Sequence, residues 1–266
     1  DEVPNAQTTY TIEDGRTWTP RNGSRTRYGE NVTLRWGLQQ SNNWISAHLI
    51  NMWRPGNFAR LLHEYGIESL SIYPSLSLCL GTADISVMEM AAAYTAFVNR
   101  GTRFLPMFVT HITNRQGDVL ATFAPETHEV ISAAASYKML DLLQAVMNGG
   151  TGSRMRYRYG VRAPMGGKTG TTNDNSDGWF MCVTPELVAA CWVGGEERDI
   201  HLGSMAYGQG AAAALPVSAK FFQGVYANPR LPYSPNVPFD IPNDFSPCAN
   251  PDEFPSDSLT VDDVFN

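Results

Sequence analysis

The sequence predicts an α+β fold in which an antiparallel sheet is packed by helices. Two apolar runs, residues 179–183 and 188–193, flank a turn-like stretch with Pro185 and are typical of an antiparallel hairpin. Several other segments carry apolar residues at helical spacing, and the strongest of them spans residues 85–98. A hairpin accompanied by amphipathic helices indicates the α+β class.

Length and composition limit the possible classes of protein. The chain has 266 residues, 43% of them apolar, which is enough for one large domain or two small ones. Its formal charge of −7 argues against general nucleic-acid binding. No apolar run reaches the roughly 18 residues of a membrane span, and no signal peptide opens the chain. Because the chain begins abruptly at Asp1, we expect it to be a fragment of a longer protein.

The elements follow from local patterns, taken in chain order. Residues 1–30 are polar and rich in turn residues, so we expect irregular surface chain, and a helix starts within residues 32–38. Ser41 or Asn42 is suited to cap a second helix that runs through residues 44–50. The remaining predictions are helices over residues 53–65, 85–98, 133–147 and 211–226 and a small hairpin of residues 108–112 and 119–123.

The cysteines and histidines do not predict a metal site. Cys79, Cys182, Cys191 and Cys248 lack metal-ligand spacing, and the five histidines show no i, i+4 pairing. If Val183 faces Val188 across the hairpin, Cys182 and Cys191 become diagonal neighbours on one face of the sheet. We favour buried thiols over a disulfide for this pair.

Residues 166–172, GGKTGTT, form the most informative stretch. Lys168 offers a positive charge, the threonines offer hydroxyls, and the glycines allow a ligand to approach the backbone, so an anion fits here. A phosphate-binding loop requires glycine where this chain has Arg162, and turn residues follow instead of a helix. We therefore favour a carboxylate ligand on a strand, with Thr169 and Thr171 on one face. The alternative is an edge strand that is merely kinked by glycine.

Two charged segments lie on either side of this stretch in the chain. Arg154, Arg156, Arg158 and Arg162 form a short basic loop, either solvated or acting as a positive rim that attracts an anionic substrate. The tail, residues 231–266, has seven acidic residues and no Lys or Arg. Such a segment cannot fold alone. We predict a linker or a strap on a body formed by residues 1–230.

The GGKTGTT stretch resembles a known signature. K-T-G belongs to the motif set of class A β-lactamases and penicillin-binding proteins. Residues 167–180, GKTGTTNDNSDGWF, resemble the KTGTTND…D-x-WF block of the bifunctional (class A) penicillin-binding proteins. Residues 18–22 (WTPRN), the segment around residues 41–43 (SNN) and residues 151–152 (TG) are also similar to that family. The resemblance covers about residues 1–228.

This resemblance implies a fold, an activity and a site. The fold is that of the penicillin-binding protein transpeptidases and serine β-lactamases, with a central antiparallel sheet beside a helical subdomain. The implied catalytic residues are Ser41 for proton relay, Asn43 for substrate contact and Lys168 for electrostatic stabilisation. The implied substrate-binding residues are Thr169, Gly170, Thr171 and Thr172, and the Thr171 N–H would complete an oxyanion hole.

The nucleophile of that chemistry is missing. The family uses Ser-x-x-Lys on one helical turn, but the three lysines here follow Ala135, Met165 and Val217 at that spacing. We therefore predict the C-terminal portion of a peptidoglycan D,D-transpeptidase, with a fold incomplete at its N-terminal side and no activity on its own. The alternatives are a non-catalytic module of this fold and a β-lactamase or β-lactam sensor.

The resemblance also implies the partners and the location. Stem peptides ending in D-Ala-D-Ala and β-lactam antibiotics would bind, and no cofactor or nucleic acid is expected. The location would be the outer face of the cytoplasmic membrane, reached through an N-terminal anchor that this chain lacks.

Overall fold

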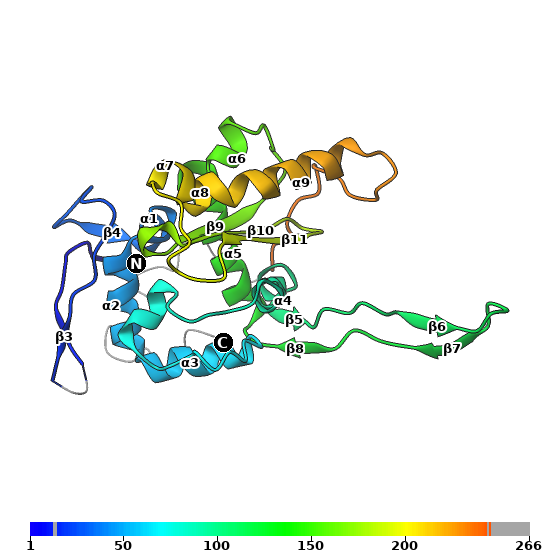
Figure 1. The fold of residues 1–266 in the computed structure, drawn as a ribbon, viewed down its shortest axis with the longest axis horizontal. Helices are drawn as coiled ribbons and strands as arrows, with labels where there is room; N and C mark the ends of the chain where they lie inside the picture. Colours follow the sequence, from blue (N-terminus) through cyan, green and yellow to red (C-terminus); the bar gives the residue numbers. More distant parts are fainter. Residues whose placement is uncertain (13–14, 244, 246–266) are drawn as a thin grey trace.

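A three-stranded antiparallel sheet forms the centre of the protein (Figure 1). The computed structural model describes residues 1–12, 15–243 and 245. The strands are β9 (Gly166–Thr171), β10 (Asp177–Val183) and β11 (Val188–Gly194), in the order β11-β10-β9. Within this sheet Val183 pairs with Val188 and Cys182 with Ala189, which confirms the predicted hairpin and its register.

Helices cover both faces of the sheet. Phe180 and Cys182 of β10 are fully buried against Phe222 of α9 (Leu215–Ala227). On β9, α5 (Ala133–Gly149) packs so closely that a Cβ on Gly166 would lie 3.1 Å from the Leu143 Cβ. The glycines at the start of β9 therefore allow this helix to approach the strand.

The other helices form a layer beside the sheet and short segments around it. α4 (Val87–Val98) packs on α5, and the Ser136 hydroxyl donates to the Ala96 carbonyl at 2.9 Å. The remaining helices are α1 (Leu34–Gln39), α2 (Asn43–Trp53), α3 (Pro55–Glu64), α6 (Arg154–Tyr157), α7 (Met205–Gly208) and α8 (Gly210–Ala213), with 3-10 turns η1 (Leu76–Leu80) and η2 (Asn173–Asn175). Within the described ranges no helix is both long and apolar enough to traverse a bilayer.

Three predicted elements differ from the structure. Residues 1–30 are not wholly irregular, because they contain the short strands β1 (Glu2–Pro4), β2 (Tyr10–Thr11) and β3 (Thr17–Trp18). Val32, predicted to be helical, lies in β4 (Asn31–Thr33), and α1 begins only after Thr33 caps it. The last helix is divided into α8 and α9 at Ala214, where Pro216 occupies the first turn of α9.

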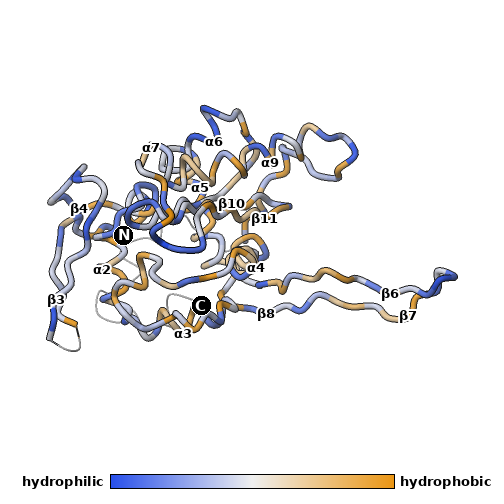
Figure 2. The backbone as a smooth tube through the Cα atoms, in the orientation of Figure 1, coloured by the Kyte–Doolittle hydropathy of each residue, from blue (hydrophilic) through white to orange (hydrophobic). Residues whose placement is uncertain are grey.

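The predicted small hairpin is the tip of a longer arm that projects from the body (Figure 1). The base of this arm pairs β5 (Thr102–Phe104) with β8 (Thr127–Glu129), and the tip pairs β6 (His111–Thr113) with β7 (Val119–Thr122). Residues 108–110, predicted to belong to the strand, lie outside both ladders. Apolar residues lie along the arm (Figure 2), and several of them are exposed, with Phe108 at 82%.

Residues 231–243, here called the strap, run from α9 across the end of the sheet (Figure 1). Phe239 of the strap is buried against Leu140 and Val183. Asp240 pairs with Arg100 at 3.0 Å. The strap thereby joins the sheet to the helical layer.

The cysteines that the structure describes are free thiols. Cys182 is buried, and Cys79 and Cys191 are partly buried. Cys191 faces Phe180 and Cys182 faces Ala189, so the two are diagonal neighbours, as predicted. The preference for thiols over a disulfide is confirmed for both, and full burial is confirmed for Cys182 only. Cys248 lies outside the described residues.

Candidate active site

Lys168 and Ser41 meet although they are 127 residues apart in the chain. The Lys168 ammonium donates to the Ser41 hydroxyl at 2.7 Å and to the Thr169 carbonyl at 2.7 Å. Burial of this ammonium lowers the pKa of Lys168 to about 8. The ammonium is therefore fixed between two walls of one site, and it exchanges its proton much closer to neutral pH than an ordinary lysine.

A tight turn between α1 and α2 presents Ser41. Gly37 allows the two helices to lie close together, since a Cβ at this position would be only 2.7 Å from the Ile45 Cδ1. Ser41 occupies the turn with φ of 53°, a left-handed conformation that costs a serine free energy. Asn42 caps α2, and its side chain accepts from the N–H groups of Trp44 and Ile45, as the sequence predicted for Ser41 or Asn42.

β9 is the edge strand of the sheet, and half of its backbone groups face the open side. The Thr172 N–H donates to the Asp177 carbonyl at 3.1 Å, which places Thr172 on the bonded side of the β9–β10 pair. Bonding alternates along an antiparallel ladder, so the backbone groups of Thr169 and Thr171 point away from β10. The edge beside Lys168 thus offers backbone donors and acceptors to an extended ligand.

The two threonines on this strand are held by different neighbours. The Thr169 hydroxyl lies 2.7 Å from the Thr151 hydroxyl, and Thr169 is buried. The Thr171 hydroxyl accepts from the Gly210 N–H at 3.0 Å and is exposed, so its own proton remains free to donate.

Gly170 and Thr172 contribute differently. A Cβ on Gly170 would lie 3.0 Å from the Trp179 Cβ, so a larger residue would crowd the neighbouring strand. The Thr172 hydroxyl donates to the Asp177 carboxylate and accepts from the Asp177 N–H. That hydroxyl closes the turn after β9, and the predicted role of Thr172 in binding substrate stays a prediction.

Asn43 faces the N-terminal loop. Its side-chain amide donates to the Arg21 carbonyl at 2.8 Å, and its backbone N–H donates to the Asn22 side chain at 3.0 Å. The structure thus brings Ser41 to Lys168 but does not bring the Asn43 amide into hydrogen-bond contact with either. A cavity of about 110 Å³ lies between this loop and Ser41, with Trp36 in its wall.

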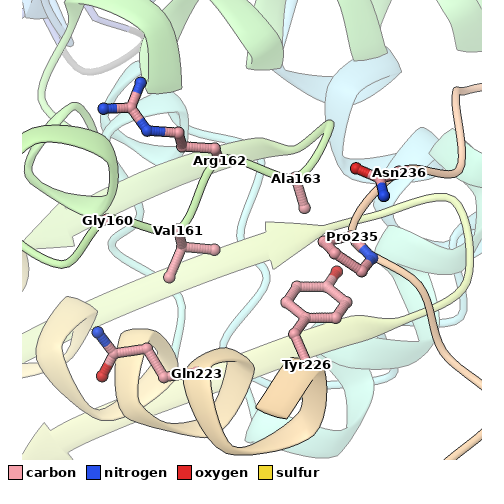
Figure 3. Close-up of a pocket in the computed structure, with 8 residues that line it drawn as sticks. All are labelled: Gly160, Val161, Arg162, Ala163, Gln223, Tyr226, Pro235 and Asn236. Atoms are coloured by element: carbon pink, nitrogen blue, oxygen red, sulfur yellow. The ribbon is translucent and has the colours of Figure 1, made fainter. Parts of the chain in front are cut away.

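A larger cavity of about 300 Å³ lies elsewhere (Figure 3). It is enclosed by Arg162, by Gln223 and Tyr226 of α9, and by Asn236 of the strap. None of the predicted catalytic or substrate-binding residues lines it. The candidate active site is therefore the edge of β9 and lies outside this cavity.

The arginines near Lys168 are mostly structural. Arg156 donates to the Val161 and Ala163 carbonyls, and Arg154 donates to the Ala211 carbonyl. These guanidinium groups hold backbone segments together, so Arg154 and Arg156 are not simply solvated, and the positive rim stays an untested alternative. Within residues 1–12, 15–243 and 245 no three His, Cys, Asp or Glu side chains gather as a metal site would need.

Two contacts of the site were missed by sequence reasoning. Thr151 was noted only as part of a resemblance, and nothing in the sequence pairs it with Thr169, which is 18 residues away. The Gly210 N–H on Thr171 was not anticipated either. A Cβ on Gly210 would lie 2.3 Å from the Gly170 carbonyl oxygen. The glycine at position 210 was therefore the only sign in the sequence that this segment lies close to β9.

Comparison with known proteins agrees with this geometry. The family model described as "Penicillin binding protein transpeptidase domain" matches residues 3–194. The chain belongs to the penicillin-binding protein transpeptidase family. The predicted family is thereby confirmed, and the matched range includes Ser41 and the whole of β9 and β10.

Relatives and solved structures extend the match beyond that range. Penicillin-binding protein 1A of Aquifex aeolicus is 32% identical over 233 residues, which is 88% of this chain and 30% of that protein. The crystal structure of penicillin-binding protein 1A from Haemophilus influenzae matches with a TM-score of 0.80 at 24% identity, over 91% of this chain and 40% of that one. The predicted α+β transpeptidase fold is confirmed, and the chain matches 25–30% of the length of its curated relatives.

A further structural neighbour contains a ligand. The PonA1 protein from Mycobacterium tuberculosis in complex with penicillin V matches with a TM-score of 0.70 at 21% identity, over 92% of this chain and 66% of that one.

Proposed function

We propose that this chain is the part of a peptidoglycan D,D-transpeptidase that binds substrate, and that it lacks the nucleophile of the reaction. The observation that carries the proposal is the 2.7 Å contact between the Lys168 ammonium and the Ser41 hydroxyl, beside the open edge of β9. This contact joins Ser41, in the segment that resembles the family, to Lys168 of the K-T-G motif. The Ser-x-x-Lys motif is absent from this sequence, because no serine stands three residues before any lysine.

The edge strand is suited to a peptide that ends in a carboxylate. An extended ligand adds to an open sheet edge through backbone hydrogen bonds. The Thr169 and Thr171 hydroxyls would donate to the terminal carboxylate, and the Lys168 charge would attract it. Gly170, between the two threonines, lets Trp179 of β10 pack closely against the strand that would carry the ligand.

The proposed reaction is acyl transfer. The serine hydroxyl supplied upstream attacks the carbonyl of the penultimate D-Ala, the terminal D-Ala leaves as an amine, and an ester joins the peptide to the serine. The amine of a second stem peptide then displaces the serine and forms the cross-link. The outward-facing Thr171 N–H would stabilise the oxyanion of each tetrahedral intermediate, and Ser41 with Lys168 would relay protons.

Partners and location follow from the same proposal. The substrates are stem peptides ending in D-Ala-D-Ala, and β-lactams compete as mimics of that dipeptide, in keeping with the penicillin V complex of the PonA1 structure. Peptidoglycan lies outside the cytoplasmic membrane, so the protein works at the outer face of that membrane.

The test is the intact mass after incubation with a penicillin. It compares this chain with a longer version that includes the native residues preceding Asp1. We expect a penicillin adduct on the longer protein and none on this chain. In the longer protein, Lys168→Gln should slow adduct formation about 100-fold, because a preorganised positive charge is lost.

Each other outcome contradicts a stated part of the proposal. An adduct on this chain would show that it contains a nucleophile of its own. No adduct on either protein would favour a non-catalytic binding module. Rapid release of hydrolysed penicillin from the longer protein would indicate a β-lactamase.

A further inference from the structure

Thr151 contacts both walls of the site. It follows the Gly150 cap of α5, and its N–H donates to the Gln39 carbonyl at 3.2 Å, two residues before Ser41. Its hydroxyl lies 2.7 Å from the Thr169 hydroxyl on β9. One residue therefore links the turn that presents Ser41 to the strand that carries Lys168.

The backbone around Thr151 is closely packed. A Cβ on Gly150 would lie 2.3 Å from the Gln39 carbonyl oxygen, and a Cβ on Gly152 would lie 2.6 Å from the Met147 sulfur. Neither flanking residue therefore has room for a side chain, and glycine at both positions lets the backbone lie close to α1 and to the Met147 side chain. Together with the bond from its N–H to the Gln39 carbonyl, this packing places the backbone of Thr151 between α5 and α1.

The direction of the hydrogen bond between the Thr151 and Thr169 hydroxyls decides what Thr169 can offer a ligand. Each threonine hydroxyl carries one proton, so only one of the two donates across the 2.7 Å contact. If Thr169 donates to Thr151, only its lone pairs remain, and these repel a carboxylate. If Thr151 donates to Thr169, the Thr169 proton is free for the ligand and is polarised by the bond that it accepts.

We propose that Thr151 is a positioning residue for the carboxylate-binding side of β9. Its hydroxyl donates to the Thr169 hydroxyl, and this bond orients the Thr169 hydroxyl as a donor to the ligand. The inference rests on the proposed function, since it names the group that prepares the carboxylate contact. The contact with Thr151 also fixes the side-chain rotamer of Thr169, so its hydroxyl and not its methyl group occupies this position.

The experiment measures how strongly the protein prefers a free carboxylate. The longer protein, extended upstream of Asp1, is titrated with a peptide ending in D-Ala-D-Ala and with the C-terminal amide of the same peptide. Thr151→Val keeps the shape of the side chain and removes the hydroxyl, whereas Thr151→Ser keeps the hydroxyl. Thr151→Ala serves as a second variant without the hydroxyl in case the valine disturbs folding.

We expect wild type to prefer the free carboxylate, Thr151→Val and Thr151→Ala to reduce that preference about tenfold, and Thr151→Ser to restore it. Affinity for the amide should remain unchanged, because the amide does not need the oriented donor. Equal losses for both peptides would reduce Thr151 to a structural residue and overturn the inference.

The same data separate this inference from the proposed function. A wild-type protein that prefers the carboxylate, with a Thr151→Val variant that keeps the preference, would overturn only the role of Thr151. A wild-type protein with no preference between the two peptides would overturn the proposed carboxylate site itself.

Discussion

At the residue scale, one ammonium group connects the two parts of the site. Lys168 was recognisable in the sequence because glycines and threonines surround it, and its contact with Ser41 could be expected only through the family resemblance. The lowered pKa of Lys168 was not predictable, since it depends on burial by segments distant in the chain. That pKa gives the site a measurable pH dependence.

The affinity for a carboxylate ligand should fall as the pH rises through about 8. Lysine is charged below its pKa, and the pKa of Lys168 is lowered to about 8, so the positive charge is present at pH 7 and largely lost at pH 9. The affinity for a D-Ala-D-Ala peptide should drop about tenfold over this interval, in proportion to the charged fraction. Titration at a series of pH values measures it. The C-terminal amide should show a flat profile, and parallel profiles for the two peptides would contradict the prediction.

At the element scale, the end of α5 is the contact point between the helical layer and the site. The sequence predicted a helix over residues 133–147, and in the structure α5 ends at Gly149 with Gly150 as its cap. The pattern could not show that the same glycine lies against the Gln39 carbonyl, because that contact joins segments more than 100 residues apart. Local signals predict where a helix ends, and long-range packing decides what its end touches.

Gly150→Ala should destabilise the protein by about 2 kcal/mol, because the new methyl group overlaps the Gln39 backbone. Gly224→Ala in α9 is the matched control. No atom lies within 4 Å of its added Cβ, and alanine favours a helix by about 1 kcal/mol over glycine. Urea unfolding of both variants measures the two effects. The prediction fails if the two variants change the free energy of unfolding in the same direction.

The start of α4 depends on a capping box. The Ser86 side chain accepts from the Glu89 N–H, and the Glu89 carboxylate accepts from the Ser86 N–H at 2.9 Å. Ser86→Ala should cost about 1 kcal/mol of stability, as loss of an N-cap usually does. Ser204→Ala should change almost nothing, because Ser204 precedes α7 without any side-chain cap bond. Thermal unfolding compares the two, and an equal loss in both would contradict the assignment.

At the scale of the whole molecule, the strap holds separate layers together. Composition predicted a linker or a strap over residues 231–266, and Phe239 was not singled out, because one aromatic residue in an acidic segment has no periodic pattern around it. The fold class and the β10–β11 register could be predicted from short-range patterns. The base of the arm and the burial of Phe239 could not, since both depend on pairing or packing between distant segments.

Phe239→Ala should lower the free energy of unfolding by about 3 kcal/mol, because it leaves a cavity against Leu140 and Val183. Asp240→Asn should cost less than about 1 kcal/mol, because its pair with Arg100 is exposed. Urea unfolding distinguishes a strap held by its aromatic residue from one held by charge. A larger loss for Asp240→Asn would reverse that conclusion.

The arm gives the protein a removable module. Its base is one short ladder, and the next backbone bond joins the Leu105 N–H to the Glu126 carbonyl at 2.9 Å. An engineer could excise residues 106–125 and close the gap with an Asn-Gly turn, which suits a two-residue hairpin. The excised piece carries Phe108 and much of the exposed apolar surface of the arm, so the trimmed protein should stay soluble at higher concentration. The candidate site lies on β9 and the turn between α1 and α2, so the shortening leaves a smaller scaffold for ligand screening.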